Sequence, residues 1–394
     1  MMQTWLAFLT ENAAYIGFVL LWAAHLRSAC SYGRMARLVR REQETCHTEG
    51  ERNKEPVSVI LTAHNQADEL HRNLPLFLEQ EYDTFEVIVV DNASTDETED
   101  VLKQMELAYP NLRHTSIPPG TRYISQKRLS ITIGIKSARY EWMLLAEPDS
   151  RPVSSGWLRS MARHFHPGIQ IVLGYANYAP GKDSLSRKAL FFNLFHEMQY
   201  LPWALRHPAY RCNPANLAYR KSLFMEHKGF AEDVNLVSGA TELLVNRHST
   251  GRNTAVSLLP ESKVVCAVPV SAKQWKLKRT YYAETRRHFI NTWHYRCAFN
   301  VKQAIVPLFY CAMVAALACS ILSRQWIGTA AVALLSVQLC VCKTVWFNRS
   351  ARAMGEHPYY LSFLWNEARM WWWHACSWLR HQAAPRAIFR RKAF

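Results

Sequence analysis

Apolar runs alternate with stretches of helical spacing through the middle of the chain. Residues 56–63 form a β-branched apolar run that begins at a proline, and residues 85–90 form a second one. Continuous apolar runs of this length are typical of strands buried on both faces of a sheet. Residues 64–80 and 95–108 carry apolar side chains at helical spacing, and Thr95 is the expected N-cap of the second helix. This order predicts an α/β fold with a mostly parallel sheet and flanking helices.

A third apolar run, residues 143–146, ends in two carboxylates, Glu147 and Asp149. Residues i and i+2 of a strand point the same way, so we expect both side chains to leave the strand end together. Like charges at that distance repel unless a cation lies between them, and Mg²⁺ or Mn²⁺ prefers carboxylate and phosphate oxygens. The pair therefore predicts a metal site for a diphosphate. The alternative interpretation is two solvated acids in a Glu-Pro turn.

Four polar side chains fall at or near the carboxyl ends of predicted strands: Asn65, Asp91, Glu147 and Asp149. In parallel sheets, ligands bind in the crevice outside these ends. The four side chains are therefore expected along one edge of the sheet.

Four segments resemble the family-two inverting glycosyltransferases of GT-A fold, and the bacterial membrane-attached members most of all. They read PVSVILTAHNQADEL, FEVIVVDNASTDET, MLLAEPDSRP and NLAYRKSLF, the last followed by KGF. The resemblance covers residues 56–296. It implies a Rossmann-like GT-A domain that transfers a sugar from a nucleoside-diphosphate sugar with inversion at the anomeric carbon.

The resemblance also implies the residues of the donor side. Asn65 and Asp91 would line the nucleotide pocket, and Lys127 would approach the diphosphate. Glu147 and Asp149 match the metal-binding Asp-x-Asp motif of the family, with Mg²⁺ or Mn²⁺ as the expected ion. Glu147 stands where family members usually have Asp.

Later segments supply the remaining implied contacts. Asn216 would lie on the acceptor side. Arg286, Arg287 and His288 fall in a segment similar to the family's Gln-x-x-Arg-Trp motif, in which Glu284 replaces the usual Gln. These basic side chains would contact the donor diphosphate or an acceptor, and Arg287 would stabilise the charge that develops on the diphosphate during catalysis. The alternative is solvated or lipid-facing charge.

The segment expected to supply the catalytic base departs from the family pattern. Family members usually have Gly-Asp/Glu-Asp there, and this chain has Gly239-Ala240-Thr241. A threonine hydroxyl is a poor base, so Glu242, one position later, is the carboxylate at hand. If the loop brings Glu242 into the base position, the chain is an active enzyme. If it does not, the chain is an inactive relative that keeps the fold as a membrane binding or scaffold module.

Three apolar stretches predict a multi-pass membrane protein: residues 13–26, 304–322 and 327–342. The alternative for the last two is a pair of buried soluble helices. Arginines follow the first stretch and basic residues follow the last, which places both flanks and the domain between them on the cytoplasmic side of the inner membrane. The expected order is a transmembrane helix (1–27), a basic cytoplasmic linker (28–55), the GT-A domain (56–299), a transmembrane hairpin (300–348) and an aromatic, basic interfacial segment (349–394).

The net charge of +16 favours acidic partners. Because the basic residues cluster beside apolar segments, an anionic membrane surface and a diphosphate donor account for them without nucleic acid. The chain has no Cys-x-x-Cys pair, phosphate-binding P-loop or dinucleotide fingerprint. Only two apolar stretches follow the domain, which favours single transfers to a lipid-linked or cell-envelope glycan over processive synthesis. The expected partners are therefore a nucleoside-diphosphate sugar, that acceptor and membrane lipids.

The charge distribution generates a test of topology. Reporter fusions at Arg41 and at Phe394 should both read cytoplasmic, and a fusion in residues 323–326 should read external, because basic flanks stay inside. An external signal at either basic end would contradict the cytoplasmic placement of the α/β domain.

Overall fold

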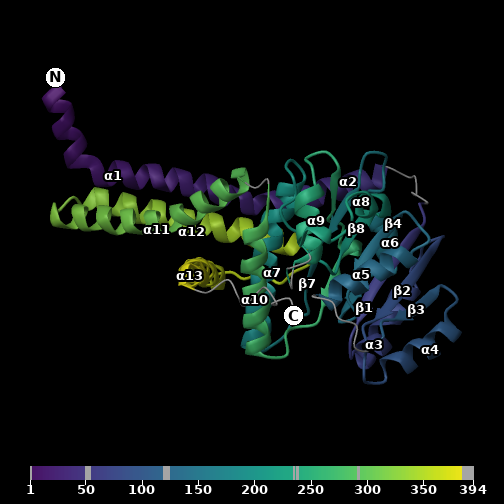
Figure 1. Cartoon of the computed structure of the whole chain (residues 1–394). Coiled ribbons are helices and arrows are strands. Elements are labelled where there is room, and N and C mark those ends of the chain that lie inside the picture. The colour runs from purple at the N-terminus through teal and green to yellow at the C-terminus, as the bar shows by residue number, and fades with distance from the viewer. Residues whose placement is uncertain are drawn as a thin grey trace. The chain divides into compact units, whose positions relative to one another are not determined.

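The computed structural model of the chain describes residues 2–48, 55–118, 125–233, 236, 239–290 and 293–383. It contains two compact units, Met1–Arg40 with Thr292–Gln382 and Arg41–Asn291 with Ala383–Phe394. We call the first the helical unit and the second the α/β unit (Figure 1). The basic tail that the sequence places after residue 383 lies outside the described residues. The five predicted segments and their bounds stay predictions.

A seven-stranded sheet forms the centre of the α/β unit. β1 pairs in parallel with β2 and β4, β2 with β3, and β6 with β9, whereas β8 is antiparallel to β4 and β6. The predicted α/β class with a mostly parallel sheet is thus confirmed. Its strands, in spatial order, are β3 (Leu112–Ser116), β2 (Phe85–Asp91), β1 (Val57–Ala63), β4 (Trp142–Ala146), β8 (Leu217–Arg220), β6 (Ile171–Gly174) and β9 (Thr254–Ser257).

Helices cover both faces of this sheet. On one face, Val59 and Leu61 of β1 share a core with α3 (Ala67–Leu78) and α6 (Trp157–Ala162). On the other face α5 (Gln126–Ser137) packs so closely that a Cβ on Gly134 would lie 2.5 Å from Ile60 Cγ2. Because alternate residues of a strand point to opposite faces, a strand covered on both sides must be apolar throughout, which explains the continuous runs in the sequence.

The helix expected from residue 95 begins later. α4 spans Thr98–Ala108, and the prediction of Thr95 as its N-cap was wrong. The backbone N–H of Thr95 donates instead to Asn65 Oδ1 at 2.7 Å, which holds this residue in the loop. Asp96 Oδ1 accepts from the N–H of Thr98 at 3.1 Å and satisfies the first turn of the helix.

A three-stranded sheet lies beside the carboxyl end of β4. Its order is β5 (Ser150–Pro152), β10 (Val264–Cys266) and β7 (Ala176–Tyr178). The chain leaves β4 at Ala146 and enters β5 at Ser150, so the acid pair lies where the chain passes between the two sheets. The unit also contains helices α7 (Ser184–Ala204), α8 (Lys221–Glu226), α9 (Ala240–His248) and α10 (Ala272–Thr285), and the 3₁₀ turn η4 (Arg286–His288).

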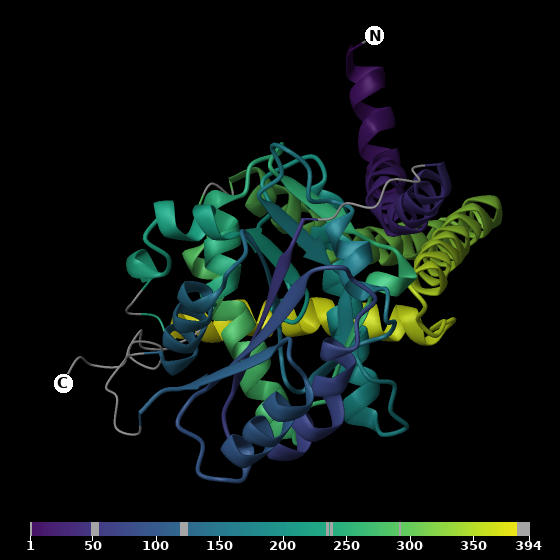
Figure 2. The same cartoon turned by 90° about the vertical axis from the view of Figure 1, so that its right-hand side faces the viewer.

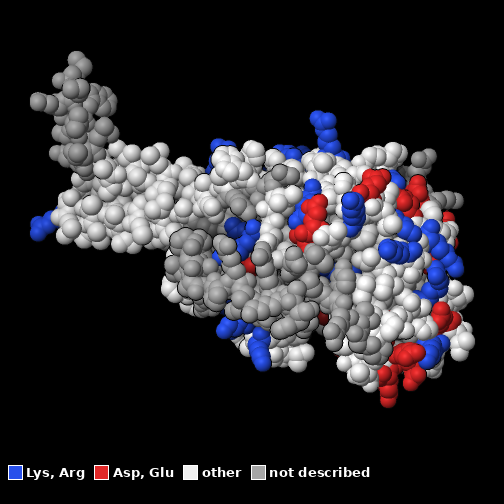
Figure 3. All heavy atoms as spheres, in the orientation of Figure 1, with Lys and Arg blue, Asp and Glu red and all other residues white. Residues whose placement is uncertain are grey.

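Three helices of the helical unit lie side by side in both ribbon views (Figures 1 and 2): α1 (Met2–Ala29), α11 (Trp293–Leu322) and α12 (Trp326–Ala353). Their shared core contains Phe18, Phe309 and Leu339. α11, α12 and the helical stretch Asn12–Cys46 are long and apolar enough to cross a membrane. The bundle shows few charged side chains on the face seen in Figure 3.

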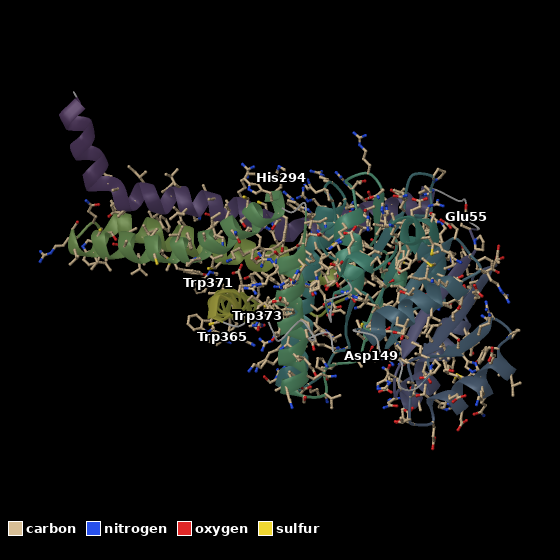
Figure 4. All side chains as sticks on the ribbon, viewed as in Figure 1. Glu55, Asp149, His294, Trp365, Trp371 and Trp373 are labelled. Atoms are coloured by element: carbon tan, nitrogen blue, oxygen red, sulfur yellow. The ribbon has the colours of Figure 1, made fainter. Side chains whose placement is uncertain are left out.

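A buried polar cluster ties α13 (Ser362–Ala383) to this bundle. Lys343 of α12 forms an ion pair with Glu367 of α13 and donates to His25 Nε2 of α1 at 3.1 Å. The opposite side of α13 exposes tryptophans such as Trp365 (Figure 4). An interfacial position for this helix remains a prediction.

Candidate functional site

The acid pair follows β4 in a tight turn. Ser150 fixes that turn, because its hydroxyl donates to the carbonyl oxygen of Glu147 at 2.7 Å and accepts from the Glu147 N–H at 3.3 Å. The strand ends at Ala146, so the strand alternation that we used to place the two acids together does not apply to them. The turn, and not the pleat of the strand, directs both side chains into one cavity (Figure 4 labels Asp149).

That cavity has a volume of about 450 Å³. Four of the predicted site residues line it: Lys127, Glu147, Asp149 and Glu242. They come from α5, the turn after β4, and α9, which are far apart in the sequence. The cavity thus combines the acid pair, a basic side chain and the candidate base.

Charge is closely balanced around the acid pair. Lys127 Nζ lies 2.5 Å from Glu147 Oε1. Burial raises the pKa of Asp149, and the negative charge of Glu147 raises it further, whereas Lys278 and Lys127 lower it. A cation between the two carboxylates would relieve this repulsion.

The donor set suits a hard divalent ion. Glu147 and Asp149 offer carboxylate oxygens, which Mg²⁺ and Mn²⁺ prefer. In the part of the chain that the structure describes, no group of three or more His, Cys, Asp and Glu side chains could hold a metal. Two carboxylates alone leave coordination positions open, and such sites are usually completed by water and substrate phosphates.

Glu242 lies in the first turn of α9. Gly239 caps this helix with φ +77°, and a Cβ there would lie 2.4 Å from Thr285 Cγ2, so a residue without a side chain is required. The Glu242 carboxylate lines the cavity, and Arg211 Nη2 lies 3.0 Å from its Oε1. Burial raises the pKa of Glu242, while Arg211 and Lys127 lower it. The altered base segment therefore still delivers a carboxylate to the cavity wall.

Asn65 and Asp91 organise the loops at the carboxyl ends of β1 and β2. Asn65 has φ +52°, and its Oδ1 accepts from the Thr95 N–H. Asp91 accepts from the N–H of Ser94 at 3.3 Å and from its hydroxyl. Neither side chain lines the described cavity, whereas Gln66, next to Asn65, does. The two residues shape the expected edge of the sheet without facing the acid pair directly.

Asn216 is buried in the core and is not among the residues that line the described cavity. Its Nδ2 donates to the carbonyl oxygens of Tyr175 at 2.9 Å and Ser262 at 2.7 Å, and its Oδ1 accepts from Trp157 Nε1 at 3.1 Å. These bonds occupy the amide on both sides, which gives Asn216 a structural role in joining neighbouring segments.

The basic segment expected to bind diphosphate forms η4, and none of its residues lines the described cavity. Arg287 Nη1 and His288 Nε2 each lie 3.5 Å from a carboxylate oxygen of Glu284. Glu284 stands where the motif usually has glutamine. It thus lies beside Arg287 and His288, two of the three basic side chains that we predicted to bind the donor.

One face of α10 forms a wall of the cavity that the sequence analysis missed. Its mixture of basic and aromatic residues fits a membrane surface as well as a phosphate. The lining residues recur at the spacing of one helical face, and this was the available signal. They are Gln274, Trp275, Lys278, Tyr281, Tyr282 and Thr285.

Glu197 of α7, also missed, lines the cavity and is fully buried. Tyr200 donates its hydroxyl to Glu197 Oε2 at 2.5 Å, and Asn213 Nδ2 donates to Oε1 at 3.0 Å. Burial raises the pKa of Glu197 to about 8, although these hydrogen bonds lower it. A proton therefore stays on Glu197 in the folded chain at pH values where an unfolded glutamate is ionised.

This proton makes stability depend on pH. Between about 4.5 and 8 the folded state binds more protons at Glu197 than the unfolded state, so the free energy of unfolding should fall as pH rises. Glu197→Gln should remove a slope of about 1 kcal/mol per pH unit in this window. Thermal unfolding of the full chain in detergent from pH 5 to 8 measures it. Glu226→Gln, at an exposed position, is the control, and an unchanged slope in Glu197→Gln would contradict the assignment.

Comparison with known proteins relates this geometry to a family. Residues 58–227, less than half of the chain, match the sequence model described as Glycosyl transferase family 2. No curated protein sequence matches the chain.

One solved structure supports the fold. The chain is similar to the mannosyltransferase PcManGT from Pyrobaculum calidifontis, solved in complex with GDP-Man and Mn²⁺, at 17% identity and a TM-score of 0.52 over 86% of this chain and 97% of that one. TarS of S. aureus (residues 1–349, in complex with UDP-GlcNAc) matches at 13% identity and a TM-score of 0.41 over 76% of this chain and 92% of that one. The predicted GT-A-like α/β fold is confirmed, and the segment that carries the acid pair matches glycosyl transferase family 2.

Proposed function

We propose that the chain is a membrane-attached glycosyltransferase of family two, which moves a sugar from a nucleoside-diphosphate sugar to a hydroxyl group with inversion. One observation carries the proposal: Lys127, Glu147, Asp149 and Glu242 line a single cavity. A diphosphate-binding acid pair and a base must lie this close together to act on one anomeric carbon.

The proposed reaction is a single displacement. Glu242 takes the proton of the acceptor hydroxyl while the acceptor oxygen bonds to the anomeric carbon. The bond from that carbon to the diphosphate oxygen breaks, and the nucleoside diphosphate leaves with the electron pair. Because attack comes from the side opposite the leaving group, the configuration inverts.

Glu147 and Asp149 would hold Mg²⁺ or Mn²⁺, which neutralises charge on the departing diphosphate when bound. Lys127 lies beside Glu147, and the positive charge of Lys278 lowers the pKa of Asp149. Both cations therefore lie near the acid pair. Their positive charge stabilises the leaving group. The similar mannosyltransferase was solved in complex with GDP-Man and Mn²⁺, which supports the choice of ion.

The remaining assignments stay predictions within this proposal. Asn65 and Asp91 remain the predicted nucleotide contacts and Asn216 the predicted acceptor-side residue, although none of the three lines the described cavity. Arg286, Arg287 and His288 are further donor contacts, which would have to turn from Glu284 toward the diphosphate. Lys278 already lines the cavity and is the stronger candidate for that charge.

The helical unit supports attachment to the cytoplasmic membrane. Each candidate span contains an apolar window long enough to cross a membrane, and the basic residues that follow the first and the last of these windows fit a cytoplasmic α/β unit. An enzyme held at this surface meets lipid-linked or cell-envelope glycans as acceptors. Membrane lipids and one such acceptor are therefore its proposed partners, with the nucleoside-diphosphate sugar.

An inactive, binding-only relative is the second candidate. The altered base segment favours it, because Ala240 and Thr241 stand where acids are usual in family two. Release of free nucleoside diphosphate from a panel of nucleotide sugars by the purified chain separates the two candidates. Release with any donor supports the enzyme, and nucleotide binding without release supports the binding module.

The acid pair generates a test by calorimetry. Asp149→Ala should abolish the Mn²⁺- or Mg²⁺-dependent part of UDP or GDP binding, because one carboxylate cannot hold the ion and the diphosphate together. Asp100→Ala, at an exposed position on α4, should bind as the wild-type chain does. The metal role would be ruled out if Asp149→Ala binds the nucleotide as tightly as the wild-type chain, or if EDTA does not change nucleotide binding by the wild-type chain.

The base generates a kinetic test. Glu242→Gln should lower turnover by about 10²–10⁴-fold with little change in donor affinity, because removal of a general base acts on the chemical step. The acid limb of the wild-type pH profile should lie above the ordinary carboxyl range, since burial raises the pKa of Glu242. Full turnover in Glu242→Gln would assign the base to another residue.

A further inference from the structure

Arg211 lies in the loop between α7 and β8, and groups from three helices surround its guanidinium. Its Nη2 is 3.0 Å from Glu242 Oε1 of α9, and its Cζ lies 3.4 Å from the ring centroid of Tyr282 of α10. Tyr200 and Glu197 of α7 also raise the pKa of Arg211 through their negative charge when they are ionised. The side chain is 18% exposed and lines the cavity.

We propose that Arg211 is the positioning residue that holds the Glu242 carboxylate in the cavity wall in its ionised form. This inference rests on the proposed function, since it assigns a task to Arg211 in the transfer reaction. Arg211 engages Oε1 of Glu242. The second oxygen, Oε2, is the one proposed to meet the acceptor hydroxyl.

A buried carboxylate needs such a partner. Glu242 is 8% exposed, and removal from water disfavours its charged form. A protonated carboxyl group cannot take a proton from an acceptor, so burial without compensation would leave the base idle. An arginine stays charged at any working pH and therefore keeps its neighbour ionised. The amino-terminal position of Glu242 on α9 favours the same charge state.

Several other groups face this pair, and none replaces Arg211. Lys127 also lowers the pKa of Glu242, but its ammonium is bonded to Glu147. Glu197 is held by Tyr200 and Asn213. Cys212, next to Arg211, has its pKa raised by burial and stays a neutral thiol. Tyr282 contributes its ring face to Arg211. Arg211 is thus the cation bonded directly to the candidate base.

The shape of the guanidinium suits this position. Its planar surface stacks on Tyr282 while an edge N–H reaches Glu242, an arrangement that a lysine ammonium cannot reproduce. Arg211 thereby compensates for Ala240 and Thr241, which stand where the family has acids. It holds the carboxylate of Glu242, which lies on α9 one position after the expected acid.

The test compares pH profiles of kcat/KM for sugar transfer. In Arg211→Gln the acid limb should move upward by about one to three pH units, because loss of an adjacent opposite charge raises a carboxyl pKa by that amount. On the acid side of the limb, kcat/KM should then fall by about tenfold for each pH unit of the shift, relative to the alkaline plateau. Arg211→Lys should place the limb closer to that of the wild-type chain.

Lys278→Met is the matched control, because it removes another cation that lines the cavity. It should weaken nucleoside-diphosphate binding and leave the acid limb in place. The proposal would be overturned if the acid limb of Arg211→Gln coincides with that of the wild-type chain while turnover falls equally at every pH. Arg211 would then be a packing residue. A shifted limb in Lys278→Met would also overturn it, since the effect would be one of net charge.

A second measurement needs no Arg211 variant and no activity. The infrared difference between the wild-type chain and Glu242→Gln reports whether Glu242 is a carboxylate or a carboxylic acid at neutral pH. A carboxylate band is expected, and a carboxylic acid band would overturn the proposal even if Arg211→Gln does not fold. Absence of transfer with every donor, together with the carboxylate band, would reject the proposed function and leave the pairing intact.

Discussion

Carboxylates buried in one cavity wall are the constraint on which the α/β unit depends. Burial raises the pKa of Asp149, Glu242 and Glu197, so each acid must either find a cation or hold its proton. Lys127 forms an ion pair with Glu147, and Arg211 forms one with Glu242. Lys127 and Lys278 also lower the pKa of Asp149. Glu197, held mainly by neutral hydrogen-bond donors, keeps its pKa near 8. The different partners separate one group of acids into an ion-binding pair, a candidate base and a buried neutral acid.

The fold makes this arrangement possible because it joins segments that are distant in the sequence. The turn between β4 and β5 carries the chain from the large sheet to the small one and places both acids at the junction. Gly239 allows α9 to start against Thr285 of α10, which brings Glu242 to the same cavity. α10 then closes the wall with Lys278 and a row of aromatic side chains. The site therefore depends on the docking of α9 and α10 as much as on the strand ends.

The sequence was most informative where a local pattern determines the structure. Continuous apolar runs identified β1 and β2, because a strand that is covered on both faces is mostly apolar. It was less informative where a long-range contact decides. Thr95 bonds to Asn65 and does not cap a helix, and Asn216 bonds inside the core. Arg211 lies in a loop without a motif, and only the folded chain shows that it meets Glu242. The face of α10 had a readable period, but its aromatic and basic composition also fits a membrane surface.

The most direct test of the account is an experimental structure of the full chain with Mn²⁺ and a non-transferable nucleoside-diphosphate sugar. A manganese signal is expected within coordinating distance of Glu147, Asp149 and a diphosphate oxygen. The Glu242 carboxylate, still bonded to Arg211, is expected on the side of the anomeric carbon opposite the diphosphate. A nucleotide bound outside this cavity, or a Glu242 side chain turned away from the sugar, would contradict the account.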